Sequence, residues 1–415
     1  MNGTLIRRGR RRGTVLRIVG VLALAILAAA CSSSGSSGTG STSAATAGGS
    51  TIKVGVICDC TGPLASEIAD GAKIYQAWAN AVNAAGGING HQVQVIVDDD
   101  ASIPANSVTD VHNLVQSDHV IALVDLTNLD ETWASYIKAQ NIPVIGSNVT
   151  EDAMFDNSDF YPEGQTEDSL PVSVIDSAKS AGATNIGLLY CAEAVQCQEG
   201  IAPLKSAGKQ LGLPVAYTGE VSATAPSYTA ECVAAQQAHV TALFIADIAE
   251  VIANVAKDCS TQGYHPIYVI DGLSVAPSFA TTPGLEDNLT GPSDDIPFYA
   301  SAPEVKAMDA ALDKYYPGLR ENAGFTQAVS NAWPSGLLLA AAAKAGGLGA
   351  NGTAPTSAEL IKGLTALKGE TLDGASPRLT YTPGQPHPVD CWYTFRLQGG
   401  KFSLPDGTSL TCSNS

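Results

Sequence analysis

Short hydrophobic runs alternate along the chain with longer stretches in which hydrophobic residues recur every three or four positions. The first run, 52–57, is rich in β-branched residues and predicts a strand. It is followed by hydrophobic residues at helical spacing: Ile68, Ala72, Tyr75, Trp78 and Val82. This stripe predicts a helix with one buried face, which ends at the glycine-containing segment 84–87.

The same alternation continues in two blocks. The first predicts strands at 92–97, 120–124 and 142–145, with helices at 106–117 and 132–140. The second predicts strands at 186–190, 242–246 and 267–270, with helices at 200–211, 251–259 and, after a gap, 333–345. A hairpin is predicted at 393–402, around Gly399 and Gly400. Nearly continuous hydrophobic strands that alternate with helices predict an α/β fold, here with two Rossmann-like lobes built on parallel sheets.

Residues 1–30 have the pattern of an export signal. Six arginines precede a hydrophobic run, 18–30. This run of 13 residues is too short to span a membrane comfortably. The run ends in LAAAC, which resembles a bacterial lipobox and predicts lipidation of Cys31, although Ala28 stands where a lipobox usually has leucine. An ordinary signal peptide cleaved after Ala30 is the alternative. Residues 31–50 then predict a lipidated cysteine followed by a flexible Ser/Gly tether.

Composition narrows the class of protein. About 365 residues follow the tether, enough for two lobes rather than one core. The signal holds six of the 22 basic residues and none of the 40 acidic ones, so the exported chain has a formal net charge of −24. Phosphate contacts need clustered Lys and Arg, and we therefore expect no nucleic-acid partner.

Eight cysteines follow Cys31: Cys58, Cys60, Cys191, Cys197, Cys232, Cys259, Cys391 and Cys412. An even number in an exported chain favours disulfides, and we expect nearest neighbours to pair. A metal site or a C-x-C redox centre at Cys58 and Cys60 is the alternative. The histidines are scattered and zinc-ribbon spacing is absent from the sequence, so we expect no metal and no cofactor.

Polar side chains gather where the predicted strands end. Ligands of open parallel sheets bind beyond the carboxyl ends of the strands, often at helix N-termini. The candidate ligand-binding residues there are Thr61, Gly62, Asp125, Thr127, Asn128, Ser147, Thr150, Asp247 and Asp271. Lys and Arg do not occur in the six loops that follow the predicted strands, which are 58–64, 125–130, 146–151, 191–197, 247–249 and 271–274. Helix capping is the alternative role of each single residue.

The run TGPLAS, followed by NAAGGINGHQVQVIVDDD and a proline, resembles the opening of the type I periplasmic binding proteins. NIPVIG at 141–146 continues the match, which covers 52–405 and is most similar to the branched-chain amino acid and amide group of ABC-transporter substrate-binding proteins, such as Leu/Ile/Val-binding protein. The resemblance implies two lobes joined by a three-strand hinge. It assigns 51–166 plus 300–378 to lobe 1, and 167–299 plus 379–415 to lobe 2.

The resemblance also implies roles for three residues. Thr127 and Thr150 fall where hydroxyl groups of that group hold the ligand carboxylate, and Asp271 falls where an acidic residue holds the ammonium. The sequence departs from the group at Cys197, where a tyrosine is common, and at 248–249, where another aromatic residue is common. The wall of the second lobe has therefore changed, and a leucine-like ligand does not follow.

These features predict an extracytoplasmic solute-binding lipoprotein of an ABC importer. It would bind a small polar solute of the amino acid or amide class by hinge closure, without chemistry on the solute. We expect a monomer on the outer face of the cytoplasmic membrane, anchored by lipid at Cys31 and docking on an ABC permease. The alternative is a ligand-sensing module that presents its bound state to a membrane receptor. An enzyme is not expected, because the sequence has no G-x-S-x-G and no H-E-x-x-H motif.

Overall fold

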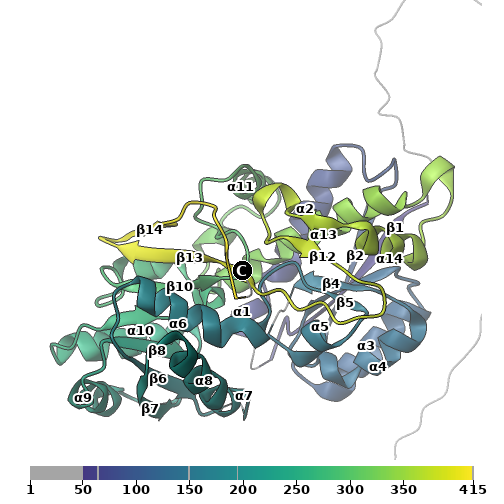
Figure 1. Cartoon of the computed structure of the whole chain (residues 1–415). Helices are drawn as coiled ribbons and strands as arrows, with labels where there is room; N and C mark the ends of the chain where they lie inside the picture. Colours follow the sequence, from purple (N-terminus) through teal and green to yellow (C-terminus); the bar gives the residue numbers. More distant parts are fainter. Residues whose placement is uncertain (1–49, 63–64, 148–149, 194, 414–415) are drawn as a thin grey trace, which may run out of the picture. The chain divides into compact units, whose positions relative to one another are not determined.

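The first of two large sheets contains five parallel strands in the order β2-β1-β3-β4-β5 (Figure 1). The computed structural model describes residues 50–62, 65–147, 150–193 and 195–413. The strands are β1 (Ile52–Cys58), β2 (Val93–Asp99), β3 (Ala122–Leu126), β4 (Val144–Ser147) and β5 (Phe160–Tyr161). The helices between them are α1 (Ala65–Ile68), α2 (Gly71–Ala84), α3 (Pro104–Gln116), α4 (Ala134–Gln140) and α5 (Asp152–Asp156).

Burial explains these elements. Strand β3 is buried at all five positions, as its continuous hydrophobic run predicts for a central strand. Helix α2 buries the predicted face, which includes Tyr75 and Trp78. The predicted stripe is divided, however, because Ile68 belongs to α1 and Asp70 precedes the first residue of α2.

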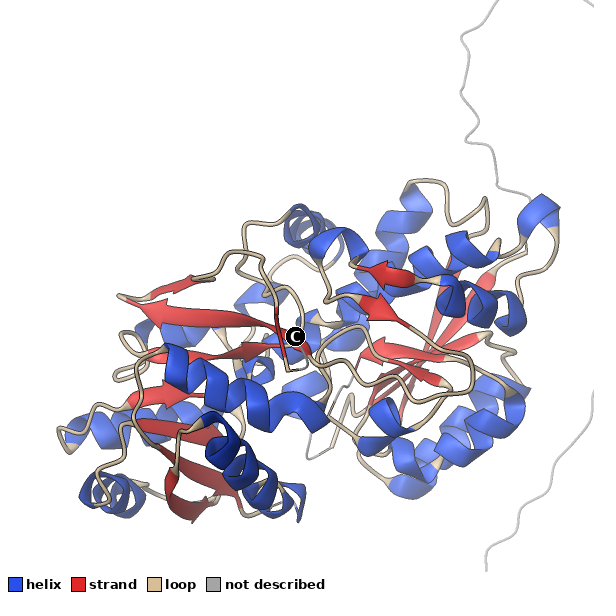
Figure 2. Cartoon of the chain, viewed as in Figure 1, coloured by secondary structure: helices blue, strands red, loops and turns tan. Residues whose placement is uncertain are grey.

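The second sheet has the order β14-β13-β10-β9-β8-β6-β7. Figure 2 draws the strands in red and the helices that pack around them in blue. The strands of the second sheet are β6 (Ile186–Cys191), β7 (Val215–Val221), β8 (Ala242–Ala246), β9 (Ile267–Val269), β10 (Leu289–Ser293), β13 (Cys391–Gln398) and β14 (Lys401–Ser403). The helices of this part are α6 (Leu170–Ser180), α7 (Val195–Glu199), α8 (Ile201–Leu211), α9 (Thr229–Gln237) and α10 (Ala249–Thr261). Strands β6 to β10 are parallel, whereas β13 runs antiparallel to β10. The predicted α/β fold with parallel sheets is confirmed.

The C-terminal chain extends the second sheet and packs helices beside the first. The predicted hairpin is β13 and β14, drawn in yellow beside β10 in Figure 1, and both glycines of its turn have positive φ. Strand β15 (Thr411–Cys412) pairs with the start of β13. Helices α11 (Pro303–Tyr315), α12 (Gln327–Ser330) and α13 (Ala332–Gly346) pack on α2, and α14 (Ser357–Ala366) packs on α13. Strands β11 (Lys368–Glu370) and β12 (Leu379–Thr380) form a small separate sheet.

Chain segments that link the two sheets are hydrogen-bonded to one another. The backbone N–H of Gln165 donates to the carbonyl of Asp294 at 3.2 Å, and that of Thr166 donates to Val389 at 3.0 Å. The hydroxyl of Ser376 donates to the carbonyl of Glu163 at 2.5 Å. Three segments distant in sequence therefore lie side by side here. The exact lobe boundaries near 167, 299 and 379 stay predictions.

Four disulfides join Cys58 to Cys60, Cys191 to Cys197, Cys232 to Cys259, and Cys391 to Cys412. These are the nearest-neighbour pairs. The Cys58–Cys60 bridge lies at the carboxyl end of β1, where the first-sheet loops begin. The C-x-C motif is thus part of a stapled loop in this structure.

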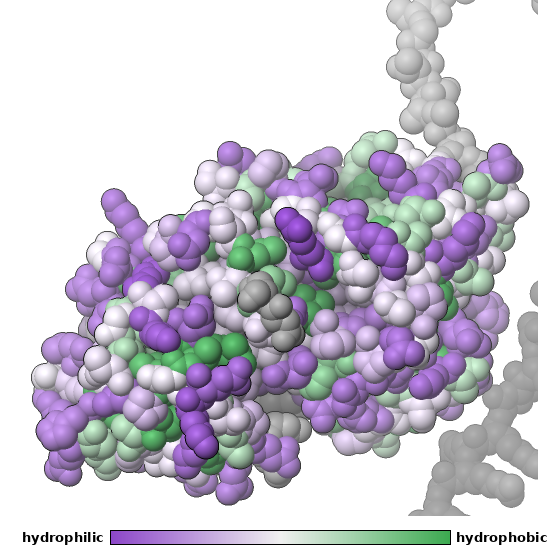
Figure 3. All heavy atoms as spheres, in the orientation of Figure 1, coloured by the Kyte–Doolittle hydropathy of each residue, from purple (hydrophilic) through white to green (hydrophobic). Residues whose placement is uncertain are grey.

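The predicted export signal, Cys31 and the tether up to residue 49 lie outside the described residues. No helix within the described ranges has the length and hydrophobicity needed to cross a bilayer. On the face drawn in Figure 3, hydrophilic residues predominate. Among described large hydrophobic residues, Val97 and Ile103 are the ones recorded as exposed, at 41% and 47%.

Candidate functional site

The carboxyl ends of β1, β3 and β4 bring several of the predicted residues together. Asp125 of β3 lies opposite Ile57 of β1 and opposite Ser147 of β4 in the two registers. The side chains of Asp125 and Ser147 are both buried. Thr127 and Asn128 follow directly in the loop after β3. The strand ends thus form one polar cluster, as the sequence predicts.

Aspartates of the same lobe accept hydrogen bonds from the polar groups of these loops. Thr61 donates through its backbone N–H and its hydroxyl to the carboxylate of Asp99, at 2.9 and 2.7 Å. The Thr127 hydroxyl donates to Asp100 Oδ2 at 2.7 Å. Side chains of the first-sheet loops are therefore held in place by carboxylates.

Asn128 and Gly62 have equally local roles. The backbone N–H and the side-chain amide of Asn128 donate to Asp59 Oδ2, at 3.0 and 3.2 Å. Gly62 has φ +97°, and a side chain there would collide with the carbonyl of Ala101, so this turn requires glycine. Thr150 is half-buried after β4, and Asn148, a polar residue of the same loop in the sequence, lies outside the described residues.

Burial raises the pKa values of several carboxyl groups near these loops. Burial, with the charge of Glu151, raises the pKa of Asp130 to about 8. Burial, with the charge of Asp130, raises the pKa of Asp125 well above its usual range. Burial also raises the pKa of Glu151 to about 7 and that of Asp100 to about 6. Each shift has desolvation as its main cause, because a low-dielectric environment disfavours the charged form.

Two predicted aspartates lie at strand ends of the second sheet. Asp247 follows β8, and its Oδ1 accepts from the backbone N–H of Ile248 at 2.7 Å. Asp271 follows β9 and caps the 3-10 turn 272–274 by accepting from the N–H of Leu273 at 3.1 Å. The Ser274 hydroxyl donates to the Asp247 carbonyl at 3.2 Å, which joins the two loops. Burial raises the pKa of each aspartate to about 6.

A small cavity of about 10 Å³ adjoins Asp271, enough for about one water molecule. Its lining residues are Gln165, Thr166, Glu167, Leu170, Asp271, Leu273 and Asp294. The Asp294 side chain is 4% exposed; its Oδ2 accepts from the amide of Asn331, and its Oδ1 has no partner among the described residues. Sequence reasoning missed Glu167 and Asp294.

The carboxyl group of Glu167 is influenced by charges from the strand ends of both sheets. Burial raises its pKa well above the usual range, and the next largest causes are the charges of Asp271 and Glu151. Asp271 belongs to a second-sheet loop, and Glu151 follows β4 of the first sheet. The carboxyl group of Glu167 is therefore close enough to both sheets to respond to their charges.

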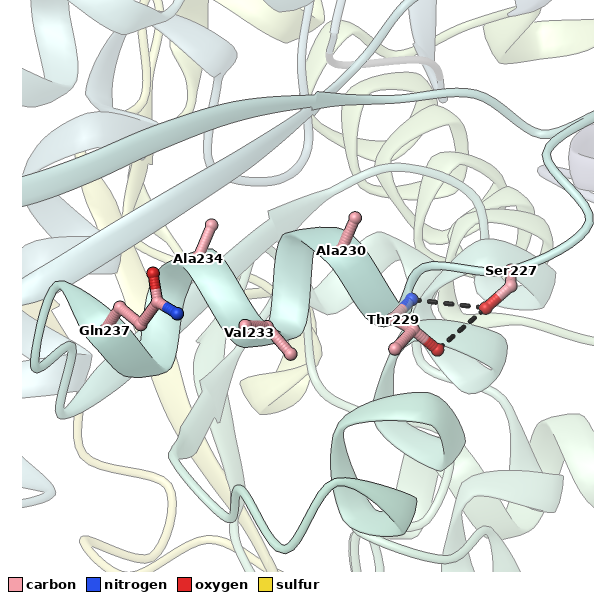
Figure 4. A pocket seen from close by; sticks show the side chains of 6 residues that line it. All are labelled: Ser227, Thr229, Ala230, Val233, Ala234 and Gln237. Atoms are coloured by element: carbon pink, nitrogen blue, oxygen red, sulfur yellow. Dashed lines mark hydrogen bonds between the residues drawn. The ribbon is translucent and has the colours of Figure 1, made fainter.

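A larger depression, of about 600 Å³, lies on the surface of α9 and the turn before it (Figure 4). It is lined by Ser227, Thr229, Ala230, Val233, Ala234 and Gln237. Within it, the Ser227 hydroxyl accepts from the N–H of Thr229 at 3.2 Å. It contains none of the predicted site residues, and its lining has no charged side chain. We therefore take the strand ends, and not this depression, as the candidate site.

Several solved structures share this fold. A branched-chain amino acid ABC transporter protein from Thermus thermophilus, with bound valine, has a TM-score of 0.75 at 14% identity, covering 88% of this chain and 97% of that one. A fatty acid ABC transporter substrate-binding protein from Thermomonospora curvata has a TM-score of 0.69 at 18% identity, covering 88% of this chain and 93% of that one. The isoleucine complex of LivJ from Streptococcus pneumoniae has a TM-score of 0.67 at 18% sequence identity. The match covers 87% of this chain and 99% of that one.

These identities are low enough that the structural likeness shows the fold alone. No curated protein matches the chain significantly. A family model described as periplasmic binding protein matches residues 51–401. This match spans most of the sequence and confirms the resemblance drawn from the TGPLAS and NAAGGING segments. The chain therefore belongs to the periplasmic binding protein family.

Proposed function

We propose that this protein is the extracytoplasmic solute-binding component of an ABC importer, anchored by lipid at Cys31. It traps a small polar solute that carries an amine or an amide between its two sets of strand ends, and releases the solute unchanged to a membrane permease. The observation that carries the proposal is the small cavity beside Asp271, which Glu167 and Asp294 also line. Ligands of open parallel sheets bind at such strand ends.

Binding requires relative movement of the two lobes in this proposal. The three linking segments are joined by hydrogen bonds of backbone groups and side-chain hydroxyls near Gln165, Thr166 and Val389. Small changes of backbone angle in a few such residues are sufficient for hinge closure. Closure removes water from the solute and strengthens each charge-assisted hydrogen bond to it.

The proposal is tested by a thermal-shift screen of amino acids, amides, amines, small carboxylates and fatty acids, followed by titration calorimetry. A solute at 100 times its dissociation constant raises the free energy of unfolding by about 2.7 kcal/mol. If every solute of the panel leaves the melting temperature unchanged, or if a compound is turned over, the proposal is wrong.

Asp271→Asn probes the site directly. Asparagine keeps an oxygen that can accept from Leu273 N–H but removes the negative charge, so binding of an amine should weaken by about 1.5–3 kcal/mol. Asp406→Asn, a charge removal on an exposed turn, is the matched control. Equal affinity of Asp271→Asn and the control in calorimetry would remove Asp271 from the site.

A further inference from the structure

Three carboxyl groups from different parts of the chain surround the small cavity. Glu167 begins the 3-10 turn Glu167–Ser169, Asp271 follows β9, and Asp294 follows β10. They are close enough to influence one another, because the charge of Asp271 raises the pKa of both Glu167 and Asp294. Carboxyl groups that lie close together oppose joint ionisation, because their like charges repel, unless a cation lies between them.

Asp294 gives this cluster an acceptor without a partner. It is 4% exposed and lines the cavity, and its Oδ1 receives no hydrogen bond from the described residues. The amide nitrogen of Gln165, another lining residue, donates instead to the hydroxyls of Ser169 and Ser173, at 2.9 and 2.8 Å. A buried carboxylate oxygen with no donor is costly, and a bound donor would remove that cost.

Basic side chains of the described part of the chain do not compensate the cluster. No lysine or arginine is among the charges that shift the pKa of Glu167, Asp271 or Asp294. The ion pairs recorded in these ranges involve Lys73 and Arg320, whose partners are aspartates outside the cavity. The described basic side chains therefore supply no positive charge to the carboxyl groups that line the cavity.

The first-sheet loops make a solute with its own carboxylate a poor fit. Three of the predicted donors there donate to aspartates of the protein: Thr61 to Asp99, Thr127 to Asp100, and Asn128 to Asp59. A solute carboxylate would have to displace these aspartates and lie beside them. Repulsion between like charges in a partly buried site opposes that arrangement.

We propose that the solute bound at these strand ends is an organic cation without a free carboxylate, a diamine or a guanidinium compound, and that Glu167, Asp271 and Asp294 bind its leading cationic group. This proposal rests on the proposed function and names the class of its solute. Ammonium and guanidinium groups supply several N–H donors and a positive charge, which the three carboxyl groups lack among their neighbours.

Calorimetry with two matched pairs of compounds tests the proposal. Agmatine and arginine differ by one carboxylate, and 1,4-diaminobutane and 4-aminobutanoate differ by a carboxylate in place of one aminomethyl group. In each pair the cation should bind at least tenfold more tightly. Equal or tighter binding of arginine and 4-aminobutanoate would overturn the proposal.

The thermal-shift panel separates this proposal from the one on which it rests. If leucine, an amide or a carboxylate stabilises the protein while both cations do not, the cationic class is wrong and the solute-binding role stands. If no compound of the panel stabilises the protein, the solute-binding role fails and the cationic class fails with it.

Two isosteric variants test the residues. Glu167→Gln and Asp294→Asn should each weaken agmatine binding at least tenfold, whereas Glu220→Gln, on the exposed edge strand β7, should leave it unchanged. Melting temperatures of the free variants check folding, and neutral isosteres are compatible with the environment that favours the neutral acids. Folded variants with the affinity of the Glu220→Gln control would overturn the assignment of these carboxyl groups.

Discussion

Asp130 is an acid that the fold holds in surroundings that favour its neutral form. Burial and the charge of Glu151 raise its pKa from 3.8 to about 8, and the adjacent Asp125 shifts in the same direction. Between pH 3.8 and about pH 8, Asp130 therefore holds a proton in the folded chain that it has lost in the unfolded chain. The free energy of unfolding should therefore fall as pH rises through this range.

Asp130→Asn should reduce this pH dependence. The amide cannot ionise, so the variant loses less stability than the native chain between about pH 5 and about pH 8. Chemical denaturation at the two pH values measures the difference, with the exposed Glu220→Gln as the control. An unchanged difference in Asp130→Asn would mean that Asp130 ionises as easily in the folded state as in the unfolded state.

Single residues also explain which part of the site could be predicted from sequence. Asp125 lies near the end of the hydrophobic strand β3, and Asp247 and Asp271 follow β8 and β9, so their positions at strand ends indicated them as site residues. Sequence reasoning did not identify Glu167 and Asp294 as site residues, because the residues that surround them in the fold are distant in sequence. Nothing in the local sequence of Asp294, for example, shows that Asn331 donates to it.

At the scale of elements, hydrophobicity predicted strands well where it was continuous. Strand β8 has the predicted bounds, and β6 extends the prediction by one residue. Strands β7 and β10 were missed, because VAYTGEV is half polar and LTGPS contains glycine and proline, residues that usually mark turns. Yet β10 is buried at every position, because β9 and β13 pair with its two edges.

The disulfides should contribute unequally to stability. A bridge restricts the unfolded chain more strongly when it closes a longer loop. Cys232 and Cys259 join α9 to α10 across a separation of 27 residues, compared with 6 for Cys191 and Cys197. Replacing both cysteines of the longer loop by alanine should cost about 3–4 kcal/mol, about 1 kcal/mol more than the same change in the shorter loop.

Guanidinium unfolding of the two double variants checks this order. Alanine at both positions of a pair leaves no free thiol, and in the fully buried longer-loop pair it removes only one sulfur atom from each residue. A larger loss in the Cys191→Ala and Cys197→Ala variant would contradict the loop-length argument. That result would point to local structure around the β6–α7 loop as the larger contribution.

At the scale of the whole molecule, three linking segments hold two sheets in one chain. The strand–helix alternation of the sequence restarts after residue 145, which indicated two lobes. The family resemblance indicated that three segments of the chain link them. The hydrogen bonds between the segments could not be predicted, because Gln165, Asp294 and Val389 are far apart in sequence and none belongs to a repeated pattern. Such long-range contacts depend on the folded lobes themselves.

The last prediction concerns how the whole protein is held at the cell surface. If Cys31 carries lipid, Cys31→Ala should move the exported protein from the detergent-extracted membrane fraction to the soluble fraction, because stable anchoring depends on acyl chains. Ser32→Ala, which changes the adjacent residue, should stay with the membrane. Fractionation after a high-salt wash, read by immunoblot, distinguishes the two cleavage models. A native protein that is already soluble would favour cleavage after Ala30 by an ordinary signal peptidase, and a Cys31→Ala variant that stays membrane-bound after the wash would rule out lipid at this residue as the anchor.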